Sequence, residues 1–225
     1  ARHAYVVLEL RPCPEIGVAS PKAFVNMLGC FHPPAIHVGQ ASGKLGPAQA
    51  QAMATELNRL PQVASRVFER GDEIRLLGED FFRGENDAFF LGRQTSHGLA
   101  LEAALKLKEI SYVHAEGYAA GELKHGPLAL LVEGSAVTAL LPLNDPSSAA
   151  MLAHVVEVQA RAARVLGVIS EADLESGKIV DEVVRVPATD PLFYPVPASI
   201  VLYLLAYHAA RSRGCPIDRP RNLAK

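Results

Sequence analysis

The second half of the chain alternates short apolar runs with longer amphipathic stretches, and this alternation constrains the fold more than any other feature. The apolar runs are residues 88–92, 136–142, 165–170 and 183–187. The stretches with helical periodicity are residues 99–113, 147–164 and 197–212. This order predicts a parallel sheet covered on both faces, which is a three-layer α/β/α architecture. Right-handed crossovers would then place a ligand beyond the carboxyl ends of the strands, near the loop after residue 92.

The N-terminal part of the chain lacks this alternation. An apolar run at residues 4–10 predicts a short strand, closed by a proline-containing turn. Residues 29–47 are rich in glycine and proline, so we expect a loop or linker there. Helical patterning follows over residues 48–83, with breaks predicted at Pro61 and near Gly71.

Charge and cysteine content exclude several classes of protein. The net charge is −2, which gives no electrostatic reason to expect nucleic acid or an anionic membrane as a partner. No apolar run reaches the roughly 18 residues of a membrane span. Cys13, Cys30 and Cys215 share no metal-ligand spacing, so we expect reduced thiols in a cytoplasmic protein. The chain begins at Ala1 without a leader pattern, so we expect no signal peptide and a fragment of a longer chain.

Two segments at the start of the alternating region carry residues suited to chemistry. The stretch GRQTSHG (92–98) could offer backbone N–H groups to a phosphate, although an ordinary helix cap is the more frequent role of its threonine and serine. On the helix that follows, Glu102, Lys106 and Glu109 fall on one face. They form either a solvated stripe of ion pairs or a carboxylate that moves a proton beside an ammonium that sets its charge.

Two later segments are also candidates. In residues 115–131, His125 is followed by Gly-Pro, so its imidazole is predicted to sit in a turn, as a proton carrier or as an ordinary exposed histidine. The C-terminal tail contains two prolines that favour an extended backbone. Its last residue, Lys225, is either a solvated end or a desolvated amine able to form a Schiff base with a carbonyl. Taken singly, none of these segments decides the function.

Taken together, ALEAALKLKEISYVHAEGYAAGELKHGPLALL (100–131) and RPRNLAK (219–225) resemble the synthase half of the glutamine–fructose-6-phosphate aminotransferase family. The segment EIGVASPKAF (15–24) is similar to the stretch that enters the family's second sugar-isomerase (SIS) domain. The resemblance implies a flavodoxin-like α/β SIS domain with an extended C-terminal tail. The implied parts are a remnant of a first SIS domain with a linker (1–46), a helical segment (47–86), the second SIS domain (87–212) and a catalytic tail (213–225).

The resemblance also implies a reaction. The site would open fructose 6-phosphate, receive ammonia and isomerise the product to glucosamine 6-phosphate, with neither a metal nor another cofactor. By residue matching, Lys225 would form a Schiff base with the C2 carbonyl of the sugar. Glu109 would carry the proton between C1 and C2, and Lys106 would steady the charge of Glu109.

Further residues and partners follow from the same match. His125 would assist ring opening in the neighbouring subunit, which implies a homodimer, and backbone around Val18 and Ala224 would line the sugar. Ammonia would come from a glutaminase domain elsewhere in the full protein. That domain and most of the first SIS domain, with its phosphate loop, are absent here, so we expect an incomplete phosphate site. Pro33–Pro34 is expected to interrupt a helix that is continuous in the family.

Two other functions stay open. One is a glutaminase-free SIS phosphosugar isomerase or deaminase, although such relatives usually vary where this chain matches the synthase. The other is a non-catalytic module that senses a phosphosugar, for which a base and a Schiff-base amine would be unnecessary. Supplying fructose 6-phosphate with glutamine, and then with ammonium, would separate the first alternative from the aminotransferase.

Overall fold

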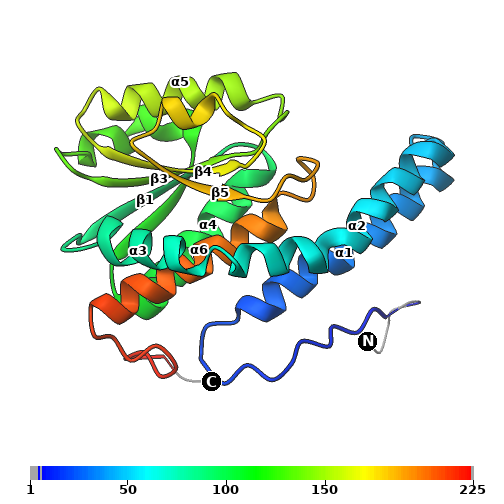
Figure 1. Cartoon of the computed structure of the whole chain (residues 1–225), viewed down its shortest axis with the longest axis horizontal. Helices are drawn as coiled ribbons and strands as arrows, with labels where there is room; N and C mark the ends of the chain where they lie inside the picture. The colour runs from blue at the N-terminus through cyan, green and yellow to red at the C-terminus, as the bar shows by residue number, and fades with distance from the viewer. Residues whose placement is uncertain (1–4, 6, 224–225) are drawn as a thin grey trace.

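The computed structural model describes residues 5 and 7–223 (Figure 1). Within them, a parallel sheet of five strands has the order β2-β1-β3-β4-β5. The strands are β1 (Asp87–Gly92), β2 (His114–Ala119), β3 (Ala136–Leu141), β4 (Arg164–Ser170) and β5 (Glu182–Val186). Helices α3 (Gly71–Phe81), α4 (Thr95–Ser111) and α6 (Pro195–Ser212) cover one face, and α5 (Ser148–Gln159) covers the other. The predicted three-layer α/β/α fold is confirmed.

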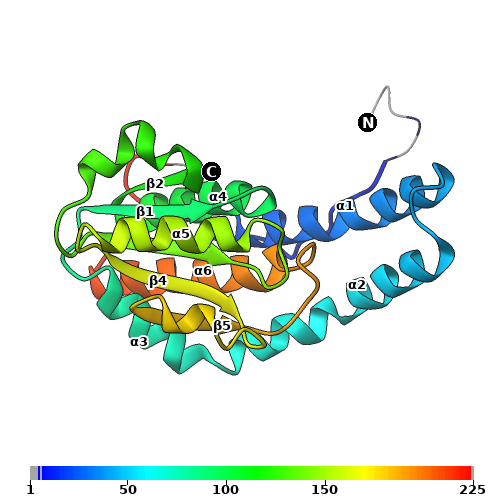
Figure 2. The same cartoon turned by 90° about the horizontal axis from the view of Figure 1, so that it is seen from above.

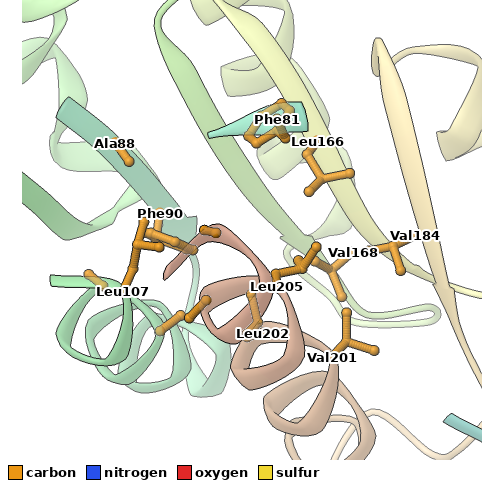
Figure 3. Packing of buried hydrophobic residues seen from close by; sticks show 14 of the residues in the cluster. Phe81, Ala88, Phe90, Leu107, Leu166, Val168, Val184, Val201, Leu202 and Leu205 are labelled. Carbon is orange, nitrogen blue, oxygen red and sulfur yellow. The ribbon is translucent and has the colours of Figure 1, made fainter. Parts of the chain in front are cut away.

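The two faces of the sheet hold separate apolar cores because helices shield both sides from water. On the α4 and α6 face, Phe90, Leu166 and Val168 from the strands meet Leu107 of α4 and Leu205 of α6 (Figure 3). On the α5 face, the buried side chains include Leu91, Val137, Met151, Val155 and Ile169. The four strands predicted from apolar runs all contribute to these cores.

Strand β2 was missed by the sequence analysis, which predicted a turn-containing segment at 115–131. It is an edge strand that pairs with β1, and only Ala115 within it is buried, so it has no apolar run to reveal it. Its Gly117 allows α4 to pack closely, because a Cβ there would lie 2.6 Å from the backbone nitrogen of Leu101. After β2 the chain forms two short 3-10 helices, η1 (Ala120–His125) and η2 (Pro127–Leu130), and a third, η3 (Ser176–Lys178), lies between β4 and β5.

Helices α1 (Pro21–Ala41) and α2 (Pro47–Phe68) form a hairpin that projects from the layered domain (Figure 2). The loop predicted at 29–47 is therefore wrong over residues 29–41, which are helical, and only residues 42–46 form a loop between the two helices. The interruption predicted at Pro33–Pro34 is also wrong. Each proline removes one helical hydrogen bond. Tertiary contacts offset that loss, because the ring of His32 stacks on Phe193 at 4.6 Å and Ile36 is buried.

The other expectations for the N-terminal part have mixed outcomes. Helix α2 continues through Pro61, so the predicted break there is wrong, since buried Leu60 and Val63 flank the proline. The break predicted near Gly71 is confirmed. The strand predicted at 4–10 is wrong over the part described, because residues 7–20 form no strand or helix and their apolar side chains find no sheet edge to join. No described helix has both the length and the apolar character needed to cross a bilayer.

Candidate functional site

The charged face predicted on α4 is a buried network. Lys106 Nζ lies 2.8 Å from Glu109 Oε2 and 3.8 Å from Glu102 Oε1. The hydroxyl of Tyr203, on the neighbouring helix α6, donates a hydrogen bond of 2.9 Å to Glu102 Oε1. The side chain of Lys106 is only 8% exposed, and those of Glu102 and Glu109 are 14% and 20% exposed. The interpretation as a solvated stripe is therefore wrong.

Burial controls the electrostatics of this network. Desolvation raises the pKa of Glu102, although the charge of Lys106 and the hydroxyl of Tyr203 oppose that effect. Desolvation and the charge of Glu102 likewise raise the pKa of Tyr203 above its usual value, so the phenol stays a hydrogen-bond donor. A buried ammonium is tolerated only when it is paired. Lys106 meets this requirement, because it lies between two carboxylates.

A cavity of about 300 Å³ opens beside Lys106 and Tyr203. The other lining residues are Pro14, Glu15, Ile16, Gly17, Ala19, Pro21, Lys22, Ile110, Tyr207, Ile217 and Asp218. Five of these, from Pro14 to Ala19, come from the segment before α1, which runs beside the C-terminal tail (Figure 1). The two segments are joined where the backbone N–H of Val18 donates to the carbonyl of Asp218 at 3.3 Å. The volume is at the lower end of the range for small-molecule sites.

A second cavity, of about 480 Å³, lies beside Glu109. Its other lining residues are Leu105, Lys108, Tyr112, Val113, His114, Arg221, Asn222 and Leu223. The ion pair between Lys106 and Glu109 thus stands between the two cavities. The tail residues that immediately precede Ala224 and Lys225 reach the side of Glu109, while Ala224 and Lys225 themselves lie outside the described residues.

His125 lies far from this network. It is exposed and ends the 3-10 helix η1, so it sits in a short helix and not in the predicted turn. The adjacent Lys124 forms an ion pair of 2.7 Å with Glu157 of α5, which places η1 on the α5 side of the sheet. Glu109 is on the α4 side of the sheet, near His114, which is the first residue of β2. The helix η1 instead follows Ala119, the last residue of β2. Six residues of strand alone span about 16 Å. Within one chain, His125 and Glu109 therefore lie on opposite sides of the sheet and near opposite ends of β2.

The sequence reasoning missed Tyr203. It stands in an apolar helical run, and its partner Glu102 is 101 positions away, so no local spacing connects them. The loop at 92–98 makes one contact to the other side of the sheet. Arg93 Nη1 lies 3.0 Å from His154 Nε2 and joins the end of β1 to α5, and α4 begins at Thr95.

Comparisons with known proteins identify the family of the chain. A family model described as "SIS domain" matches residues 81–212. A glutamine–fructose-6-phosphate aminotransferase [isomerizing] of Methanosarcina mazei is 46% identical over 224 residues, covering 100% of this chain and 36% of that protein. The corresponding protein of Symbiobacterium thermophilum is 44% identical over 225 residues, covering 100% of this chain and 37% of that protein. The chain thus spans about a third of the length of these relatives.

Solved structures give the same picture. The C-terminal domain of glucosamine-fructose-6-phosphate aminotransferase from Francisella tularensis superposes with a TM-score of 0.84 at 33% identity. The match covers 92% of this chain and 57% of that chain. A putative phosphosugar isomerase from Silicibacter pomeroyi superposes with a TM-score of 0.71 at 24% identity over 92% of this chain and 57% of that chain, which supports the fold alone.

Proposed function

The chain belongs to the SIS domain family, and from this premise we propose that it is the isomerase portion of a glutamine–fructose-6-phosphate aminotransferase. The substrates would be fructose 6-phosphate and ammonia, and the product glucosamine 6-phosphate. The observation that carries the proposal is the buried ion pair of Lys106 and Glu109, which stands beside the end of the C-terminal tail. The names of the relatives support the same activity.

The proposed chemistry assigns one role to each group. The amine of Lys225 would condense with the C2 carbonyl of the open sugar and release water, and ammonia would then displace the lysine and leave an imine at C2. Glu109 would take a proton from C1 and return it to C2, while the hydroxyl proton of O1 passes to nitrogen. The product has an aldehyde at C1 and an amine at C2. Lys106, 2.8 Å from Glu109, would balance the charge of the carboxylate and orient it as a base.

The positions of the other matched residues support a homodimeric site. Because His125 and Glu109 lie on opposite faces of the sheet, we propose that His125 assists ring opening at the site of a second copy. Backbone around Val18 and Ala224 would line the sugar, and Val18 is already held against the tail through Asp218. A glutaminase domain elsewhere in a longer cytoplasmic protein would supply the ammonia. The division of the chain into four parts, with boundaries after residues 46, 86 and 212, belongs to the same proposal.

Product formation by the full-length protein tests the function. We expect glucosamine 6-phosphate from fructose 6-phosphate and glutamine. Product from ammonium only would instead support a glutaminase-free isomerase or deaminase. A hexose phosphate that raises the melting temperature while no product forms would support a sensing module.

A substitution at Glu109 tests the proposed base. Glu109→Gln should lower kcat by about 100- to 10,000-fold, the usual contribution of a positioned proton carrier. Binding of fructose 6-phosphate, followed as a rise in melting temperature, should persist. Glu133→Gln, which changes an exposed glutamate in a turn, is the matched control and should leave kcat unchanged. Near-normal kcat in Glu109→Gln would rule out the assignment.

A further inference from the structure

The C-terminal tail is attached to the end of α4 near its base, through Arg213 and Cys215, and again at Arg221. Near its base, Arg213 Nε donates to the carbonyl of Ser111 at 3.1 Å. Eight residues later, the backbone N–H of Arg221 donates to the phenol oxygen of Tyr112 at 2.8 Å, and the guanidinium of Arg221 lies 4.2 Å from the centre of the Tyr112 ring. A hydrogen bond and a cation–π contact therefore meet on a single side chain.

Tyr112 has an unusual backbone conformation at this position. It immediately follows α4 with φ 63° and ψ 14°, which is left-handed. Glycine or asparagine is the usual residue at such a helix end, because a bulky side chain is strained there. Strain of this kind persists where the surrounding structure uses the side chain. Here the phenol holds the tail, which gives a reason for a tyrosine in place of a less strained residue.

The attachment lies close to the proposed base. Glu109 and Tyr112 are three residues apart at the end of α4, and both line the 480 Å³ cavity together with Arg221 and Leu223. Among the described residues, the bond between Arg221 and Tyr112 is the last hydrogen bond before the C-terminus. Four further residues reach at most about 14 Å from Arg221. The position of Arg221 therefore limits where the amine of Lys225 can act.

We propose that Tyr112 is a positioning residue for the reaction, one that fixes Arg221 and so directs the end of the tail toward Glu109. This inference rests on the proposed function, because it assumes that Lys225 reacts with the sugar. Tyr112 itself takes no part in the chemistry. Its contribution is to raise the fraction of molecules in which the tail is in place.

Two substitutions separate this role from that of a simple helix cap. Tyr112→Phe removes the hydrogen-bonded hydroxyl but keeps the ring below Arg221. Tyr112→Asn removes both contacts and places at the left-handed position a residue that adopts it readily. If Tyr112 were only a cap, Tyr112→Asn should preserve or raise the melting temperature and leave turnover unchanged. Arg219→Met removes an exposed positive charge from the same tail and is the matched control.

The experiment uses the full-length enzyme with three measurements: kcat and KM for glucosamine 6-phosphate formation, the rate of borohydride trapping of fructose 6-phosphate on Lys225, and amide hydrogen exchange of the tail. In Tyr112→Asn we expect kcat and trapping to fall together by about tenfold or more, with faster exchange at the Arg221 amide and an unchanged melting temperature. Tyr112→Phe should lose about two- to tenfold, the contribution of one hydrogen bond. Arg219→Met should match the wild type.

Two results would overturn the inference. One is normal trapping and turnover in Tyr112→Asn, whatever its exchange. The other is an Arg221 amide that stays equally protected in both tyrosine variants. If Tyr112→Asn proves unstable, Tyr112→Phe decides, because it keeps the ring and the backbone conformation. A wild-type enzyme that forms no product would refute the proposed function instead, and exchange at Arg221 would still show whether Tyr112 holds the tail.

Discussion

Replacing Lys106 by methionine should destabilise the protein in a strongly pH-dependent way. The substitution keeps the length and the apolar stem of the side chain but removes the charge 3.8 Å from Glu102 and 2.8 Å from Glu109. Glu109 faces a cavity that water can enter, whereas Glu102 is enclosed by Tyr203 and the helix. Glu102 must then either remain charged in a buried site or take up a proton.

Protonation sets the upper limit of the cost. The ordinary pKa of the Glu102 carboxyl is 4.5. Keeping it neutral at about pH 7 costs about 3.4 kcal/mol, at about 1.36 kcal/mol for each pH unit above that pKa. At about pH 5 the same limit is only about 0.7 kcal/mol. When the pKa of a group is raised in the folded state, the folded state becomes less stable as the pH rises. The unfolding free energy of the variant should therefore fall furthest below that of the wild type at neutral pH.

Urea unfolding of the chain at the two pH values measures this effect. We expect Lys106→Met to lose about 2–3.4 kcal/mol of unfolding free energy at about pH 7 and less than about 1 kcal/mol at about pH 5. Lys108→Met changes an exposed lysine of the same helix and should stay within about 0.5 kcal/mol of the wild type. An equal loss at both pH values would refute the reasoning, because it would mean that packing and not charge is responsible.

Two further predictions follow from neighbouring contacts. Tyr203→Phe leaves Glu102 without its 2.9 Å donor and should cost about 1.5–3 kcal/mol of unfolding free energy, measured by urea titration; a cost near zero would show that water replaces the hydroxyl. Gly117→Ala would bring a Cβ to 2.6 Å from the backbone of α4 and should lower the unfolding free energy by about 1–3 kcal/mol. Gly29→Ala, with open space around it inside α1, is the control and should be neutral or stabilising. Equal melting temperatures for the two variants would contradict the close packing of β2 on α4.

The sequence predicted the sheet well where burial determined the residues. Strands β1, β3 and β4 carry continuous apolar runs because helices cover them on both sides, and such runs are legible without a structure. Strand β2 was not predicted because it lies at the edge of the sheet and is only partly buried, so it has no continuous apolar run. Helix α1 escaped because Pro33 and Pro34 are penalised locally, whereas the contacts that stabilise the helix come from distant residues.

The candidate site could be predicted only in part from the sequence, for the same reason. The spacing of Glu102, Lys106 and Glu109 on one helix predicted their shared face correctly. The burial of that face depends on Tyr203 and on the segment before α1, which are distant in sequence. The separation of His125 from Glu109 depends on which side of the sheet each connection crosses. Residue types alone carry no information about that choice.

The position of Lys106 links the chemistry of the two cavities. The ammonium of Lys106 lines the 300 Å³ cavity, and it is paired with Glu109, whose carboxylate lines the 480 Å³ cavity. An anionic group bound in the 300 Å³ cavity would therefore compete with Glu109 for the positive charge of Lys106.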